Sequence, residues 1–167
     1  MMRKASQLPT RPHGTWVTLA SMLLASVLGS VHAFSVFLEP VENYFQNSRS
    51  QVSLTYSFTL LFLTVGVLLG HRFYGLLRPV GFSIAVCGLA LSGTLIAASA
   101  THITMVWLGY SLLFGLANGL GYGFALQISA QSCLENKGFV MGLVTASYTL
   151  GSVLLPWPLT FVLNSLV

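Results

Sequence analysis

The sequence predicts an all-α integral membrane protein with five transmembrane helices. Of its 167 residues, 54% are hydrophobic and only 6% are charged, whereas a soluble domain has roughly 25% charged residues. The seven basic and three acidic residues lie in short clusters between long uncharged segments. Because those segments are long enough to cross a hydrocarbon core of roughly 30 Å, the charged clusters are expected in the loops.

Residues 1–15 are polar and basic and predict a cytoplasmic tail, and residues 16–167 predict the transmembrane domain. The stretch Val80–Leu134 has no full charge and is too long for one helix rising about 1.5 Å per residue, so it predicts a hairpin that turns at Ser99–Thr104. A cleaved secretory signal is the weaker interpretation of the first span, because that span is long for a signal and more spans follow. The predicted helices are residues 16–38, 52–70, 80–100, 104–132 and 139–162.

The basic residues predict the orientation in the cell membrane. Only Arg49 lies on one side, and the other side has Arg3, Lys4, Arg11, Arg72, Arg78 and Lys137. Because basic residues are enriched in cytoplasmic loops, the N-terminus is expected inside. Five spans then place the C-terminus outside.

Polar residues inside the spans are candidates for a functional path. His32 belongs to a small and polar face of the first span, and it is the ionisable residue of that face. An ionisable residue inside a span indicates function by default. Two interpretations of His32 are equally good: a neutral imidazole that is hydrogen-bonded to a neighbouring group, or a residue with a role in substrate or proton binding. Asn118 and Tyr122 lie four residues apart in the fourth span, and Tyr148 lies in the fifth.

Glycines predict where helices pack closely. Gly115, Gly119 and Gly123 recur every fourth residue, so they share one slowly drifting face of the fourth helix. A face without side chains lets another backbone approach, and Gly142 and Gly151 suggest the same for the fifth helix. The alternative is a helix that faces lipid with incidental glycines, because glycine is frequent in membrane spans.

The sequence offers no site of the usual enzymatic kinds, so neither an enzyme nor a cofactor is expected. Its four histidines are isolated, its glutamates lie in loops, and Cys87 and Cys133 lie within or at the end of apolar segments. No metal site is expected from these groups. Nucleic-acid binding is not expected either, because the basic residues are scattered and their placement has a topological explanation.

Two stretches together resemble a known family. The first is Gly29–Phe73, with Gly29, Ser35, Phe37, Pro40, Arg49, Ser50, Ser53 and Gly66. The second runs from Gly115 to Pro158, with Gly119, Gly121, Gly142, Gly151, Ser152 and Pro156. Both resemble the oxalate:formate antiporter family of the major facilitator superfamily, to which the monocarboxylate transporters are close neighbours.

The resemblance implies membrane transport of small organic anions. His32 and Phe34 stand where that family favours Tyr and Trp facing the translocation path, and the path candidates are His32, Phe34, Ser35, Asn118, Tyr122 and Tyr148. The superfamily's gating loop normally reads Gly-x-x-x-Asp-Arg-x-Gly-Arg. Here His71 replaces the acid and the glycine comes one residue late, so this loop departs from the superfamily's gating pattern; the corresponding residues are Gly66, His71, Arg72, Gly75 and Arg78.

The five spans resemble an incomplete N-terminal six-helix half of such a transporter, truncated or split from its second half. The resemblance places the cationic groups that hold carboxylates mainly in the second half. Besides the lipid bilayer, the expected partner is therefore a second half or a further copy of the chain. The alternative is a membrane protein that does not transport, either a remnant or a helix-packing interaction partner.

Overall fold

The computed structural model describes residues 12–74, 78–133 and 135–154, and these residues form helices and short connections without a strand. This confirms the all-α class. Four helical stretches are long and apolar enough to cross a membrane: Gly14–Phe45, Arg49–Phe73, Pro79–Ala98 and Ile103–Ser132. A further helix, α7 (Lys137–Leu154), follows them, so the chain is a multi-pass membrane protein.

The first stretch is longer than predicted. It consists of α1 (Pro12–Leu28), a 3-10 helix η1 (Gly29–Ala33) and α2 (Phe34–Phe45). Proline suits the first turn of a helix, so α1 begins before the predicted residue 16. The predicted end at residue 38 is wrong, because α2 accommodates Pro40 in its interior and ends only where Gln46 adopts a left-handed conformation with φ 54°.

The second and third spans are α3 (Arg49–Phe73) and α4 (Pro79–Ala98). A capping box begins α3 three residues before the predicted start. In it the Gln51 backbone N–H donates to Ser48 Oγ at 3.4 Å, and the Ser48 N–H donates to Gln51 Oε1 at 3.3 Å. Pro79 occupies the first turn of α4, where its missing N–H costs nothing.

The fourth span changes its helix type along its length. It begins as α5 (Ile103–Val106), becomes a π-helix η2 (Trp107–Phe114) and continues as α6 (Gly115–Ser132). Its limits agree with the predicted residues 104–132, and the turn at residues 99–102 is where the polar cluster predicts it. The predicted end of the fifth span, residue 162, lies outside the described residues.

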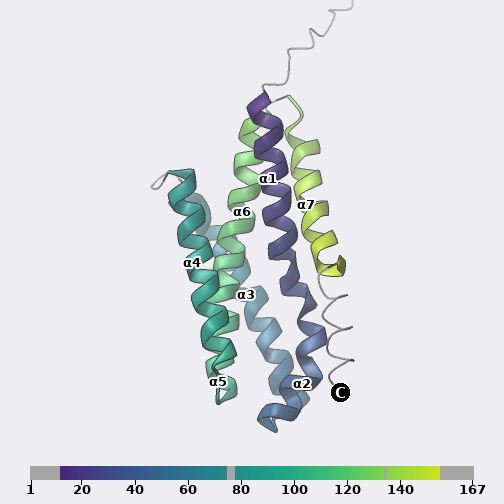
Figure 1. Cartoon of the computed structure of the whole chain (residues 1–167), viewed down its shortest axis with the longest axis vertical. Helices are drawn as coiled ribbons and strands as arrows, with labels where there is room; N and C mark the ends of the chain where they lie inside the picture. Colours follow the sequence, from purple (N-terminus) through teal and green to yellow (C-terminus); the bar gives the residue numbers. More distant parts are fainter. Residues whose placement is uncertain (1–11, 75–77, 134, 155–167) are drawn as a thin grey trace, which may run out of the picture.

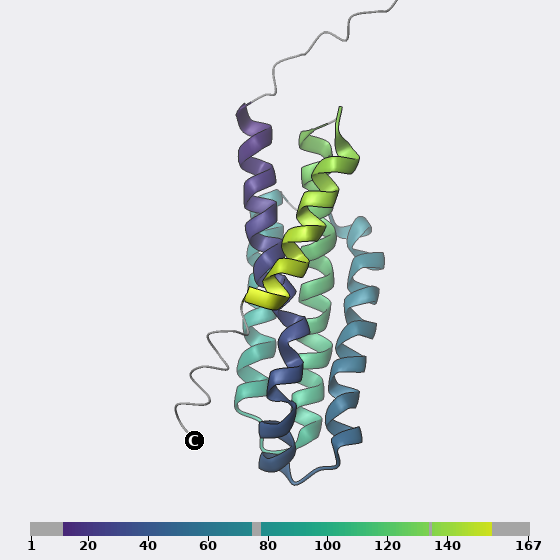
Figure 2. The same ribbon diagram turned by 90° about the vertical axis from the view of Figure 1, so that its right-hand side faces the viewer.

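Helix α6 is at the centre of the bundle, where it contacts α1, α3, α4 and α7. In Figures 1 and 2 the starts of α1 and α7 lie at one end of the bundle, and α5 and the end of α2 lie at the other. The spans therefore alternate in direction, as the predicted topology requires. Two buried apolar clusters flank α6: one joins α1 and α7 through Ala25, Ala125 and Val144, and the other joins α4 through Phe82 and Phe124.

Helices α3 and α6 pack with their backbones in direct contact. A methyl group on Gly115 would lie 2.9 Å from the carbonyl oxygen of Thr59, and one on Gly119 would collide with the carbonyl oxygen of Leu63. From the other side, a methyl group on Gly66 would lie 2.7 Å from the carbonyl oxygen of Leu116. The two backbones therefore touch along this line, which any larger residue would separate.

The other predicted packing glycines have different surroundings. Gly151 lies against the backbone of Ser26 on α1, whereas Gly123 faces the side chain of Tyr74. The expectation that Gly142 packs against a neighbouring helix is wrong among the described residues: Gly142 is exposed, and none of their atoms lies within 4 Å of where its Cβ would be. It faces outward because the inner face of α7 is formed by Val140, Val144 and Tyr148.

Candidate functional site

His32 lies on η1 and contacts two tyrosines from other helices. Its Nδ1 is 2.7 Å from the hydroxyl oxygen of Tyr56 on α3. The ring of Tyr148 on α7 meets the imidazole edge-on, with centroids 5.3 Å apart at 86°. His32 is half-buried, so it is both held by the protein and accessible.

Asn118 joins three helices from the centre of the bundle. Its side chain is fully buried. Its Nδ2 donates to the carbonyl oxygen of Leu28 at 2.6 Å, and its Oδ1 accepts from the Tyr148 hydroxyl at 3.0 Å. Leu28 is the last residue of α1, so Asn118 fixes the point at which the first span changes from α to 3-10 geometry.

Tyr122 extends this arrangement along α6. Its ring lies 4.5 Å from that of Tyr148, and its hydroxyl is 3.1 Å from Oγ1 of Thr145. Thr145 is exposed on α7, so this part of the arrangement reaches the surface of the chain.

On the other side of His32, Phe34 is buried between two tyrosines. It stacks on Tyr56 with centroids 6.2 Å apart and lies 5.2 Å from the ring of Tyr110. Tyr110 donates to the carbonyl oxygen of Val31 at 3.4 Å. We call the connected side chains the His32 cluster: His32, Phe34, Tyr56, Tyr110, Asn118, Tyr122 and Tyr148.

The structure thus brings together five of the six predicted path residues. The sixth, Ser35, is exposed on α2 one turn after His32. Sequence reasoning missed Tyr56 and Tyr110, although a pair of tyrosines inside uncharged spans was a signal that could have found them, because a buried phenol needs a hydrogen-bond partner.

The π-helix is anchored to α3 next to the cluster. The Trp107 indole N–H donates to Oγ1 of Thr55 at 3.1 Å, and the Ser111 hydroxyl donates to the Thr55 carbonyl oxygen at 2.8 Å. Thr55 precedes Tyr56, and Tyr110 lies between the two anchoring residues of η2. Segments of π-helix are frequent at functional sites, and here the segment holds Tyr110 against Phe34.

The four predicted gating residues that the structure describes do not all lie together. Gly66 lies inside the α3–α6 contact, whereas His71 and Arg72 are exposed at the end of α3. His71 Nδ1 is 2.6 Å from the carbonyl oxygen of Leu68 in its own helix. Arg78 is exposed at the N-cap of α4, and Gly75 lies outside the described residues.

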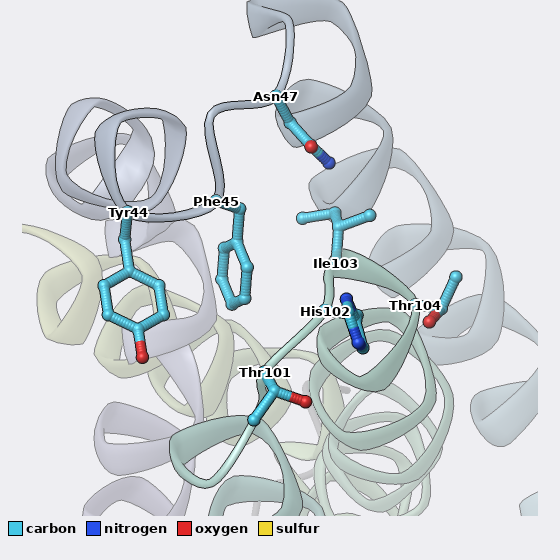
Figure 3. A pocket seen from close by; sticks show the side chains of 7 residues that line it. All are labelled: Tyr44, Phe45, Asn47, Thr101, His102, Ile103 and Thr104. Carbon is cyan, nitrogen blue, oxygen red and sulfur yellow. The ribbon is translucent and has the colours of Figure 1, made fainter.

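A separate hollow of about 400 Å³ lies at the end of the bundle away from the start of α1. Figure 3 shows Phe45 and His102 pointing into it from the end of α2 and the turn before α5. Its other lining residues are Tyr44, Asn47, Thr101, Ile103 and Thr104. It shares no residue with the His32 cluster.

The chemistry available in the cluster is hydrogen bonding and aromatic contact. Imidazole and phenol groups both donate and accept hydrogen bonds, and His32 is the one member that can carry a positive charge. Among the described residues there is no group of three or more His, Cys, Asp or Glu side chains that could hold a metal ion.

Comparison with known proteins gives one similarity of note. No family model matches the chain. Over 142 residues, or 83% of its length, it is 28% identical to the uncharacterized MFS-type transporter YhjX of Escherichia coli (strain K12). The match covers 35% of that protein, so the chain spans about a third of the length of this relative. The similarity supports the resemblance to the major facilitator superfamily and, in general terms, a role in transport.

Proposed function

We propose that this chain forms one wall of a transporter for small organic anions of the monocarboxylate or oxalate and formate type. The His32 cluster is the observation that carries the proposal, because it gathers polar and aromatic side chains from η1, α2, α3, η2, α6 and α7 in the middle of the bundle. Transporters of the related superfamily bind substrate near the bilayer midplane, at the interface of two helical bodies. The similarity to an MFS-type transporter supports the same placement here.

The cluster suits a small anion in two ways. The imidazole of His32 can donate a hydrogen bond to a carboxylate oxygen, and the half-buried ring of Tyr56 beside it offers apolar surface to a short carbon chain. A buried carboxylate also needs compensating charge. The family resemblance assigns most of that positive charge to a second half.

A second helical body is therefore part of the proposal. Alternating access requires two bodies that move around a shared site, and the described helices form one bundle. We propose that the second body is a separate transporter half; the alternative is a further copy of this chain. It would cover Thr145 and Ser35, which are exposed at the edges of the cluster.

Ligand protection of a single cysteine tests the site. Ser35→Cys, in a chain in which Cys87 and Cys133 are replaced by serine, should react with a maleimide more slowly as formate, oxalate or lactate is added, and the protection should saturate. His32→Ala should abolish it. The matched control is Ser92→Cys, which is exposed on α4 away from the cluster and should react at a constant rate. Equal protection at both positions, or none at Ser35, would contradict the proposal.

One observation favours the second candidate function, a helix-packing interaction partner. Gly138 and Gly142 are exposed on α7, and no atom of the part of the chain that the structure describes lies within 4 Å of either Cβ position. Small residues four apart allow close association of membrane helices. If this is the function, Gly142→Leu should abolish self-association measured by energy transfer between labelled chains, and no anion should protect Ser35→Cys.

A further inference from the structure

His32 uses one ring nitrogen for a hydrogen bond with the protein. Its Nδ1 pairs with the Tyr56 hydroxyl at 2.7 Å. In the part of the chain that the structure describes, Nε2 has no protein partner. Because no buried side-chain nitrogen there lacks a partner, Nε2 is not buried. Nε2 is therefore the nitrogen that is free to meet a ligand.

The Tyr56 hydroxyl determines which nitrogen carries the proton. A neutral imidazole has one N–H donor and one lone-pair acceptor. Within the described residues, the Tyr56 hydroxyl has no partner besides His32 Nδ1. If Nδ1 carried the proton, the phenol proton of the half-buried Tyr56 would have no acceptor among the described protein groups, which is unfavourable. The arrangement that satisfies both groups has the Tyr56 O–H donating to Nδ1 and the imidazole proton on Nε2.

Two further contacts hold the ring in place. Tyr148 packs edge-on against the imidazole, and its own hydroxyl is fixed by the buried Asn118. Phe34 stacks on Tyr56 and restrains that side chain too. The orientation of the His32 ring is thus set from α3 and α7 together.

We propose that Tyr56 is a positioning residue that holds His32 as the Nε2-protonated tautomer, so that Nε2–H donates to an acceptor oxygen of the ligand. For the anions of the proposed function, on which this part of the inference rests, that oxygen belongs to the carboxylate. The tautomer selects against ligands that present only a donor at this position, such as an ammonium group.

The tautomer can be measured without any ligand. In the full chain labelled with ¹⁵N-histidine and reconstituted in lipid, solid-state nuclear magnetic resonance at alkaline pH distinguishes a protonated Nε2 from a protonated Nδ1. The His32 signals are identified by their loss in His32→Gln. We expect His32 as the Nε2-protonated form, and a mixture of both tautomers in Tyr56→Phe, which keeps the ring that stacks on Phe34. A protonated Nδ1 in the parent chain, or an unchanged spectrum in Tyr56→Phe, would overturn the inference.

Binding of labelled lactate, formate and oxalate tests the role of Nε2. A glutamine amide reaches about as far as Nε2 and an asparagine amide about as far as Nδ1. We expect both substitutions of His32 to weaken binding, and His32→Asn to raise the Kd about tenfold more than His32→Gln, the ratio expected for one hydrogen bond. Equal values for the two variants would contradict the role of Nε2. If the parent chain binds none of the three anions, the proposed function fails, whereas the spectrum alone decides the tautomer.

Discussion

Helices α6 and α7 both carry glycines at helical spacing, yet the two sets have opposite surroundings. Gly115 and Gly119 on α6 meet the backbone of α3, whereas Gly138 and Gly142 on α7 meet no described atom within 4 Å. The difference lies in the neighbours: α6 is enclosed by four helices, and one face of α7 is open. Glycine spacing therefore predicts a face that permits close approach, and the rest of the bundle decides whether it is used.

The largest expected effect is the loss of stability caused by a leucine in the α3–α6 contact. Gly119→Leu should destabilise the chain by about 3 kcal/mol, the upper end of overpacking costs, because a rigid backbone blocks the new side chain. It should lower the folded yield in detergent far more than the reference substitution Leu112→Ala. Gly142→Leu is the matched control on α7 and should leave the yield of the isolated chain near that of the parent. Similar yields for the two leucine variants would mean that the glycines of α6 are not tightly packed.

A smaller effect is expected from the polar side of α6. Asn118→Leu removes two interhelical hydrogen bonds, each worth about 0.6 kcal/mol on average in membranes, and leaves the Tyr148 hydroxyl without its partner. We expect a loss of roughly 1 to 2 kcal/mol in the free energy of unfolding in mixed micelles. Tyr148→Phe removes only one of the bonds and should cost about half as much. A larger loss in Tyr148→Phe than in Asn118→Leu would contradict this network.

The smallest expected effect lies on the open face of α7. Thr145→Val removes the hydrogen bond between Thr145 and Tyr122, which is exposed at the edge of the His32 cluster. Its cost should stay below about 0.6 kcal/mol in the same unfolding measurement. A cost as large as that of Asn118→Leu would show that α7 is as tightly coupled to α6 on this side as in the core.

Orientation is tested by labelling and involves no change in stability. Cysteines placed at Thr101 and Asn136, in a chain in which Cys87 and Cys133 are replaced, should react from outside and from inside the cell, respectively. Both positions are exposed, and they lie in turns at opposite ends of the spans. This labelling pattern is expected because basic residues are in excess on the side of the N-terminus. The reverse labelling pattern would overturn the predicted orientation.

The sequence sufficed to place the described spans apart from the end of the first, and five of the six predicted path residues lie together, while their role in transport stays a prediction. Charge-free segments predict membrane helices because the bilayer excludes charge, so the turn at residues 99–102 was correctly placed. The end of the first span was misplaced because Glu39, Pro40 and Glu42 were assigned to a loop, whereas α2 continues through all three to Phe45.

Other features depend on tertiary contacts that a single sequence does not encode locally. Nothing in the residues of η2 distinguishes a π-helix from an α-helix; its anchors are on α3, at Thr55. Tyr56 escaped notice for the same reason, because its role depends on the proximity of His32, 24 residues away. The outward direction of Gly142 likewise follows from which side of α7 meets α1 and α6.

We propose that this chain provides an anion-binding wall around His32 and needs a second body for transport. The most direct measurement uses purified chain in liposomes with labelled formate, oxalate and lactate, and follows both bound label and counterflow-stimulated uptake. We predict saturable binding that is lost in His32→Ala, together with no saturable counterflow, because one bundle has no partner to close the site on either side. Absence of saturable binding would contradict the anion site. Saturable counterflow by this chain without another protein would contradict the need for a different second half. It would indicate that identical copies serve as both bodies.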